Sequence, residues 1–384
     1  MSDTGAIEPR IRNGEGLIFW LTGFTLLVVL PLLNVLPTPD SLLHVSDFAL
    51  NRFGKFLCFA ILALGLDLIW GYTGILSLGH GVFFGLGAYA IGMHLMLNIG
   101  TESVYGSALP DFMVWNQVKE LPFFWKPFYS FGVALAGAIL VPTLFALVFG
   151  FLAFRSRIKG VYFAIITQAL ALCAWLVFNR NETNLGGTNG LTDFKQVLGF
   201  RLSEPGTQRA LYILTVLCLG GAYLLCRWII RSRTGRVLVA IRDSEQRVLF
   251  SGYSPANYKL FVFVVSAALA GLAGALYVPQ VGIITPAQIG VLPSLEMVIW
   301  VAVGGRGTLL GAALGAVGVN WARSVLTNYF PELWPFFLGG LFVTVVLLFP
   351  DGLVGLFARV REKWVASGLW VRKSPTTSES NGRV

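Results

Sequence analysis

The sequence predicts an all-α fold, a polytopic transmembrane helical bundle of about ten membrane segments, and three observations indicate it. Of the 384 residues, 55% are hydrophobic and only 12% are charged, about half the roughly 25% found in soluble domains. The apolar residues gather in runs near the roughly 20 residues that a helix needs to cross a bilayer. Short polar stretches separate the runs. This composition excludes an ordinary cytosolic enzyme, a disordered protein and a disulfide-rich secreted domain.

Ten apolar runs follow one another along residues 17–356, the predicted transmembrane domain. They cover residues 17–36, 53–70, 75–97, 128–154, 160–178, 210–230, 260–278, 285–303, 309–326 and 335–349. The first run is longer than a signal-peptide core and no A-x-A cleavage site follows it, so we expect an uncleaved span. The eighth run is short and contains Pro293, and we expect a broken or re-entrant helix there.

Basic residues predict the orientation of the bundle, because Lys and Arg concentrate in the cytoplasmic loops of membrane proteins. With a cytoplasmic N-terminal segment 1–16, every strongly basic stretch falls on the cytoplasmic side; these are residues 155–159, 227–259 and 359–373. The tail 357–384 is then cytoplasmic too, and its polar end is expected to be disordered. The net charge of +9 is therefore a topology signal, and no nucleic-acid partner is needed to explain it.

The outer segments are those in which acids and bases nearly balance; they are residues 37–52, 98–127 and 179–209. Segment 98–127 is rich in aromatic residues and proline, which suits a segment lying at the outer headgroups. Segment 179–209 contains the turn-rich stretch GGTNG at residues 186–190.

The cytoplasmic segment 231–259 predicts a short amphipathic helix. Its apolar residues fall on one helical stripe with charged residues largely opposite; the stripe consists of Val237, Leu238, Ile241, Val248 and Leu249. Ser251 and Gly252 then supply a stop signal. Such a helix either lies on the membrane surface or docks a soluble partner, and the pattern favours neither.

Motifs that could indicate an enzyme or a cofactor are weak. Residues 85–90 match G-x-G-x-x-A, but they lie in an apolar run, where small residues serve helix packing. Asp67, Ser77 and His80 would form a hydrolase triad only if they converged in space, and Ser77 and His80 are expected on one helix. The cysteines, Cys58, Cys173, Cys218 and Cys226, show no C-x-x-C spacing, so we expect buried cysteines and no metal site.

No G-x-x-x-x-G-K-[ST] motif occurs in the chain. If transport is driven by ATP, another subunit must therefore supply the nucleotide site. Small residues spaced four apart predict close helix crossings; they are Gly81 and Gly85, Ala267, Gly271 and Ala275, and Gly307, Gly311 and Gly315.

Carboxylates within apolar runs are candidates for function. Asp67 lies inside the second run and Glu296 inside the eighth. A charged side chain at the centre of a membrane helix costs about 2.5–3.5 kcal/mol on insertion scales, so it usually faces a cavity or a partner. For Asp67 a place on a transport pathway and a structural hydrogen bond are equally open.

An ordered set of motifs resembles the permeases of ABC importers for branched-chain amino acids and amides. The set begins with GLDLIWGYTG at 65–74, LSLGHG at 76–81 and FGLGAY at 84–89, and continues with GGTNGL at 186–191, GRV at 235–237 and AIRD at 240–243. YKL at 258–260, SAALAGLAGA at 266–275 and GGRGTLLG at 304–311 complete it. Within that family the chain is most similar to the C-type permease of urea importers, on DLIW at 67–70, TQALAL at 167–172 and IWVAVG at 299–304.

The resemblance implies a transport subunit without catalytic residues, metal or bound cofactor, in a bacterial inner membrane. Its implied partners are a second homologous permease, two cytoplasmic ATPase subunits that use ATP and Mg²⁺, and an extracytoplasmic substrate-binding protein. By analogy, the 235–252 helix couples to an ATPase; the residues assigned to coupling are Gly235, Arg236, Ile241, Arg242, Asp243 and Gly252. For a urea pathway the candidate residues are Asp67, Ser77, His80, Gln168 and Glu296, chosen for their polar groups and not carried over from a known site.

Other functions stay open at this point. A permease for branched-chain amino acids or short amides is the nearest alternative to a urea permease. A stand-alone secondary transporter or channel would need no ATPase, and inverted repeats that would favour it are not evident in the sequence. A membrane enzyme is disfavoured because no nucleophile motif or metal cluster stands out.

Overall fold

The computed structural model describes residues 21–38, 41, 44–156, 158, 160–348, 352 and 355. The predicted cytoplasmic segments 1–16 and 357–384 lie outside the described residues. Seven described helices are long and apolar enough to cross a membrane, and three shorter apolar helices accompany them. Each of the ten predicted runs contains one of these helices, so the predicted all-α polytopic bundle is confirmed.

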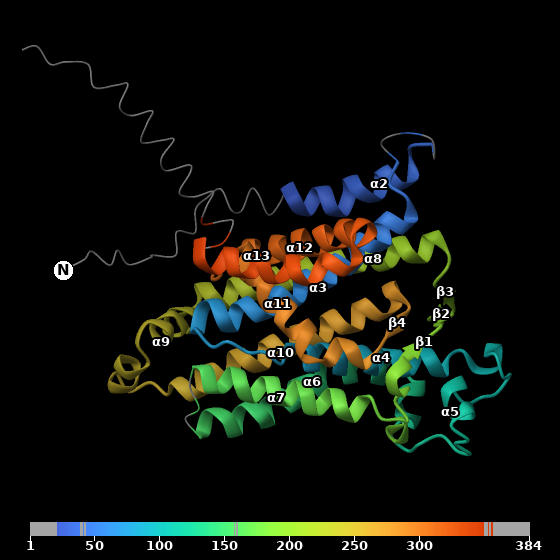
Figure 1. Ribbon diagram of the computed structural model, residues 1–384, viewed down its shortest axis with the longest axis horizontal. Coiled ribbons are helices and arrows are strands. Elements are labelled where there is room, and N and C mark those ends of the chain that lie inside the picture. The colour runs from blue at the N-terminus through green and yellow to red at the C-terminus, as the bar shows by residue number, and fades with distance from the viewer. Residues whose placement is uncertain are drawn as a thin grey trace, which may run out of the picture.

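The long helices are α3 (Asp47–Thr73), α4 (His80–Leu97), α6 (Phe131–Arg155), α7 (Val161–Phe178), α8 (Pro205–Arg231), α10 (Pro255–Val281) and α12 (Leu309–Tyr329). The shorter ones are η1 with α2 (Thr25–Val29 and Leu30–Val35), α11 (Val291–Gly304) and α13 (Trp334–Leu348). They run roughly along the longest axis of the molecule, with α9 (Arg233–Phe250) at one end and α5 (Asp111–Trp115) at the other (Figure 1). We name these the α9 end and the α5 end; in the predicted topology the α9 end is cytoplasmic.

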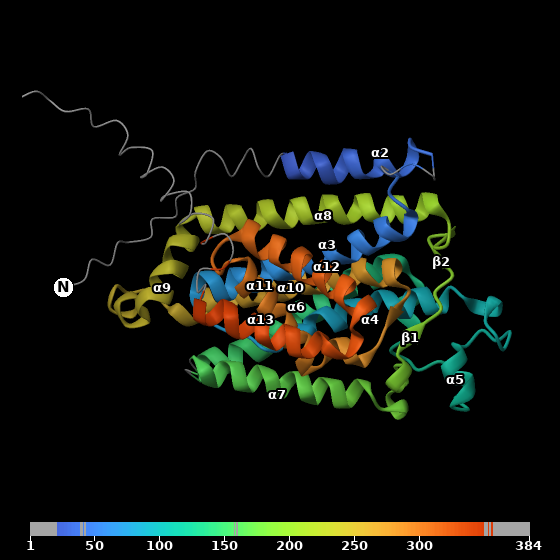
Figure 2. The same cartoon turned by 45° about the horizontal axis from the view of Figure 1, so that its top comes forward.

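The centre of the bundle is built around α10, which packs against both α3 and α4, whereas α2 and α7 lie at opposite edges (Figure 2). Glycines permit the close packing: a Cβ at Gly87 would lie 2.2 Å from Gly271 O, and one at Gly274 would lie 2.0 Å from Phe84 O. On α11 and α12, a Cβ at Gly315 would lie 2.2 Å from Trp300 O. Residues of the predicted small-residue patterns thus do mark helix crossings.

The peripheral helices turn apolar side chains outward, as a lipid-facing surface requires. Exposed residues of this kind include Leu144 and Val148 on α6, Leu172 and Leu176 on α7, and Leu217 and Leu224 on α8. Cys173 is exposed on the same surface. The expectation that every cysteine is buried is therefore wrong for Cys173, because α7 sits at the edge of the bundle.

The ends of α3 and the start of α4 differ from the boundaries that the apolar runs predicted. α3 begins after Ser46, whose Oγ accepts a hydrogen bond from Ala49 N at 3.3 Å, and ends at Gly74, whose φ of +75° favours glycine. The third span begins at His80 instead of residue 75, so Ser77 precedes the helix. The expectation that Ser77 and His80 share one helix is wrong, because α3 ends at the left-handed cap Gly74 and residues 75–79 are not helical.

The eighth run is broken as expected. It starts with the 3₁₀ turn η6 (Pro286–Ile289), is interrupted at Gly290 and continues as α11. The Gln288 side chain caps the turn, since Thr285 Oγ1 and Thr285 N both donate to Gln288 Oε1.

Short strands fasten the connections at the α5 end. β1 (Leu191–Thr192) pairs antiparallel with β4 (Ile283–Ile284), and β2 (Gln196–Val197) pairs with β3 (Phe200–Arg201). The GGTNG stretch leads into β1. Gly190 has a φ of +69°, and a Cβ there would lie 2.0 Å from Ile284 O, so glycine is needed for segment 179–209 to dock on the connection after α10.

Candidate functional site

The helix α9 forms the predicted amphipathic element at one end of the bundle. Ser232 Oγ accepts a hydrogen bond from Gly235 N at 3.4 Å and caps its start. Gly235 is buried where the chain turns from α8 into α9, and a Cβ there would lie 1.9 Å from Ile230 O. Leu238, Ile241 and Val248 face inward, so most of the predicted stripe packs against the spans.

The end of α9 carries exposed apolar side chains. Phe250 is 92% exposed, Leu249 is 50% exposed and Tyr253 is 49% exposed. Leu249 was predicted on the buried stripe; a kink at Ser244, with φ −162° and ψ 96°, rotates the last turns out of phase with the first. Gly252 follows with a φ of +83°, the backbone region in which glycine is favoured.

Two polar contacts fasten α9 to the central helices, one on each side of this kink. Arg242 Nη1 donates to Gly71 O, at the end of α3, at 2.9 Å. Lys259 Nζ, at the start of α10, lies 2.8 Å from Glu245 Oε1, in the wall of a cavity of about 430 Å³ between α6, α9 and α10. The other two charged residues assigned to coupling, Arg236 and Asp243, are exposed, and Asp243 Oδ1 lies 3.3 Å from Arg242 Nε. A movement of α9 would therefore pull on α3 and on α10.

Asp67 lies near the C-terminal end of α3, close to Gly71. We name the contact at this place the Gly71 junction; it consists of Asp67, Gly71, Tyr72, Arg242 and Gly307. Asp67 Oδ1 accepts a hydrogen bond from Gly307 N at 2.7 Å. Tyr72 Oη donates to Gly307 O at 2.9 Å. A Cβ at Gly71 would lie 2.3 Å from Asp67 Oδ1 and 2.5 Å from Gly307 N. The junction ties α3 to the α11–α12 connection and, through Arg242, to α9.

The carboxylate of Asp67 is fully buried, and its second oxygen has no hydrogen-bond partner among the described residues. Neither the cavity beside α9 nor the larger one described below includes Asp67. The geometry thus favours the structural alternative for Asp67, and its predicted place on a transport pathway stays a prediction.

His80 and Ser77 belong to a buried hydrogen-bond chain in the centre of the bundle. His80 Nδ1 lies 2.9 Å from Ser77 Oγ and His80 Nε2 lies 2.7 Å from Ser266 Oγ. Ser266 Oγ donates to Gly65 O at 2.6 Å, so its proton is already engaged. Ser266 Oγ must then accept from His80 Nε2–H, which leaves Nδ1 to accept from Ser77 Oγ–H. This chain satisfies the imidazole fully and joins α3, α4 and α10.

Asp67 takes no part in that hydrogen-bond chain, since its carboxylate accepts from Gly307 N. The partners of His80 are two serines. A Ser–His–Asp arrangement is therefore not assembled among the described residues, which agrees with the weak motif evidence for hydrolysis.

Gln168 lies half-buried on α7. Its neighbour Thr167 contacts the connection between α3 and α4 instead, because Thr167 Oγ1 accepts from Leu78 N at 2.9 Å. The structure thus places Ser77 and His80 together, and leaves Gln168, Asp67 and Glu296 at separate positions.

Glu296 lines a cavity of about 730 Å³ near the α5 end, whose lining comes from α3, α4, α10, η6, α11 and α12. Its Oε2 accepts from Arg323 Nη1 on α12 at 2.5 Å. Two further basic residues, Arg52 and Lys55, come from the first turns of α3. Lys55 and Arg323 were not among the candidate residues from the sequence. Both are nevertheless ionisable residues within predicted spans, which is the feature that identified Asp67 and Glu296 as candidates.

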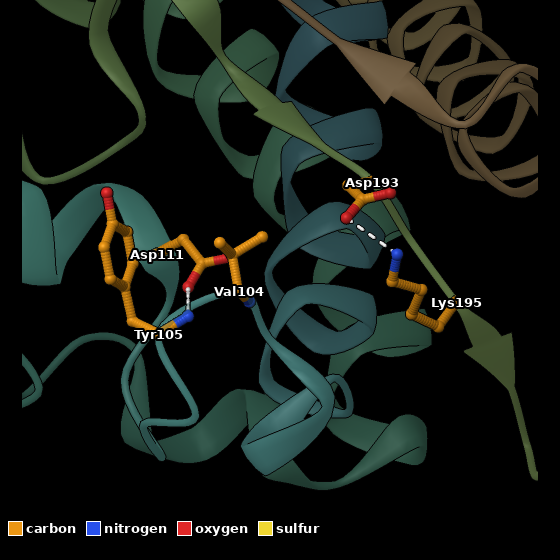
Figure 3. Close-up of polar contacts among 5 residues, drawn as sticks. All are labelled: Val104, Tyr105, Asp111, Asp193 and Lys195. Carbon is orange, nitrogen blue, oxygen red and sulfur yellow. Dashed lines mark hydrogen bonds and ion pairs between the residues drawn. The ribbon is translucent and has the colours of Figure 1, made fainter.

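The connections at the α5 end are ordered by polar contacts (Figure 3). Asp111 at the start of α5 accepts hydrogen bonds from Val104 N at 3.1 Å and from Tyr105 N at 3.3 Å. Lys195 Nζ lies 2.8 Å from Asp193 Oδ2. Trp125 Nε1 donates to Asn184 O at 3.1 Å and so joins segment 98–127 to segment 179–209. Segments 98–127 and 179–209 are therefore joined into one folded surface at the α5 end.

Comparison with known proteins identifies relatives of the chain. Residues 48–346 match the family model described as "Branched-chain amino acid transport system / permease component". The branched-chain amino acid permease LivM of Escherichia coli is 27% identical over 323 residues, which are 78% of this chain and 68% of the relative. The probable permease LivM of Methanocaldococcus jannaschii is 25% identical (77% and 89% covered), and BraD of Pseudomonas aeruginosa is 24% identical (77% and 91% covered). No solved structure matches the chain.

Proposed function

Because the chain belongs to the family of permease components of branched-chain amino acid transport systems, we propose that it is one membrane subunit of an ATP-driven importer for branched-chain amino acids. Three relatives compared above are described as branched-chain amino acid permeases. They support this substrate better than the urea predicted from three short motifs. The subunit transports and does not catalyse; ATP hydrolysis belongs to partner subunits.

The observation that carries the proposal is the attachment of α9. Its first part is fastened to α3 through Arg242 and Gly71 O, and its second part is fastened to α10 through Glu245 and Lys259. Beyond these contacts, Phe250 is 92% exposed. An exposed aromatic residue beside charged ones suits a docked partner, since aromatic residues and arginine are enriched where protein interfaces bury their core. Two ATPase subunits are the proposed partners at this end.

The assembly that we propose contains a second, homologous permease subunit in the inner membrane. A substrate-binding protein docks on the outer surface that segments 98–127 and 179–209 form. Binding and hydrolysis of ATP shift the importer between outward-open and inward-open states, a two-state equilibrium that the nucleotide biases. Both chain termini lie in the cytoplasm in this arrangement.

We expect the variant Arg242→Glu to assemble with its partners and to reduce the uptake of labelled leucine at least about tenfold. The substitution removes the hydrogen bond to Gly71 O and places a carboxylate beside that carbonyl oxygen, and an interaction with a charged donor is worth about 1.5–3 kcal/mol. The measurement is leucine uptake in a strain that lacks the gene and carries either the wild-type or the variant chain, with labelled urea run in parallel.

Arg242→Lys is the matched control, since it keeps a positively charged donor at the same position, and it should retain more uptake than the glutamate variant. Normal leucine uptake by Arg242→Glu in the assembled importer would contradict the coupling role of α9. If the strain that lacks the gene loses urea uptake but keeps leucine uptake, the proposed substrate is contradicted.

A further inference from the structure

The cavity near the α5 end holds charged and aromatic groups that the proposed coupling does not use. Its volume of about 730 Å³ falls in the range of roughly 300–1,000 Å³ that is usual for small-molecule sites. It extends from Asn51 at the start of α3 and Asn328 at the end of α12 to Trp300 in α11. In the predicted topology this is the outer half of the bundle, where a substrate enters.

Lys55 contributes a positive charge to this cavity. Among the described residues it forms no ion pair; its Nζ lies 5.9 Å from the ring centroids of both Phe59 and Tyr277. Glu296, the acidic residue of the cavity lining, is paired with Arg323 through Oε2, and its Oε1 forms no ion pair among the described residues. A half-buried ammonium within a span is costly unless an opposite charge compensates it. A negatively charged ligand group near Lys55 would therefore be stabilised in this cavity.

Aromatic side chains form the wall beside this ammonium. The ring of Phe59 lies 4.9 Å from that of Trp300 and 5.6 Å from that of Tyr277, centroid to centroid. Together they present an apolar surface next to Lys55, and Glu296 adds a carboxylate on the adjacent helix α11. A ligand with a carboxylate, an aliphatic group and an ammonium would find a complementary group for each part.

We propose that this cavity is a binding site for a zwitterionic aliphatic amino acid, with the ligand carboxylate on Lys55, its aliphatic side chain against Phe59, Tyr277 and Trp300, and its ammonium toward Glu296. The assignment rests on the proposed function and adds the residues that hold the substrate within the membrane subunit. Neutral urea could accept a hydrogen bond from the ammonium of Lys55 but would not pair with its charge. The site therefore discriminates by charge as well as by size.

The test compares Lys55→Gln with Lys55→Arg in the complete importer, in a strain that lacks the native gene. We expect Lys55→Gln to lower the maximal leucine uptake per assembled importer about tenfold or more, the factor that corresponds to losing a hydrogen bond between charged groups. Lys55→Arg keeps the cation and should retain most of the uptake. Saturating binding protein and leucine ensure that translocation, and not capture by the binding protein, limits the rate.

A second measurement does not depend on transport. Ser324 lines the cavity on α12, and Ser324→Cys should react with a membrane-impermeant thiol reagent above the wild-type background. Saturating L-leucine should slow this reaction, whereas urea should leave it unchanged. The same protection should be lost when Lys55→Gln is added.

The outcomes separate the two claims. If the wild-type importer takes up no leucine, the proposed function fails. If it takes up leucine, but Lys55→Gln imports it at the wild-type rate or leucine does not protect Ser324→Cys, the cavity assignment is overturned while the proposed function stands.

Discussion

Substituting Gly71 by alanine is expected to destabilise the protein by about 3 kcal/mol or more, at the upper end of the cost of overpacking. A Cβ at Gly71 would lie 2.5 Å from Gly307 N and 2.8 Å from Gly307 Cα, and both are backbone atoms that a rotamer change cannot move. The α11–α12 connection would have to shift away from α3, which would break the hydrogen bonds of Asp67 and Tyr72 to Gly307. Thermal unfolding of the detergent-solubilised importer, with and without the substitution, measures the effect.

Gly220 and Gly221 provide the matched control for this substitution. Both lie inside the long helix α8, as Gly71 lies inside α3, but a Cβ at either position would meet nothing within 4 Å. Alanine there should leave the unfolding temperature unchanged or raise it slightly, because alanine favours the helix. Equal behaviour of Gly71→Ala and Gly220→Ala would show that the α3 contact with Gly307 is not tight.

Asp67 is the residue with the next largest expected effect, and two substitutions separate its possible roles. Asp67→Asn keeps an oxygen that can accept from Gly307 N, so stability and leucine uptake should stay near those of the wild type. Asp67→Ala leaves the buried N–H of Gly307 without an acceptor, which costs about 1–3 kcal/mol, and it should lower both the unfolding temperature and the uptake.

Uptake kinetics per assembled importer decide between the two roles. A changed apparent affinity or maximal rate for leucine in Asp67→Asn, with unchanged stability, would place the carboxylate on the transport pathway instead of in the Gly71 junction. The wild-type chain and Asp67→Asn differ little in side-chain volume, so a packing defect cannot account for such a change.

The sequence predicted the features that depend on local pattern. Runs of apolar residues located the seven helices long enough to span a membrane and the three shorter apolar helices, and the stripe around Leu238 and Ile241 located α9. Pro293 and the short eighth run indicated a broken helix, which the turn η6 and the interruption at Gly290 show. These features follow from periodicity and chain length, which a single sequence contains.

Features that depend on distant contacts could not be predicted in this way. Asp67 meets Gly307, which lies 240 positions further along the chain, and His80 meets Ser266, which lies 186 positions away. A polar residue in a span signals that a partner exists, but not which residue it is. Lys55 and Arg323 are ionisable residues within predicted spans, as Asp67 and Glu296 are. Their role depends on the cavity that five helices and η6 line.

ATP-dependent accumulation of leucine in proteoliposomes tests the central claim most directly. The complete importer, with its second permease, its ATPases and its binding protein, is reconstituted with ATP on the ATPase side, and labelled leucine is supplied on the other. The account predicts that leucine accumulates above its external concentration only when ATP is present, and that labelled urea does not. Leucine that merely equilibrates at the same rate without ATP would contradict the account and indicate a channel or a secondary transporter.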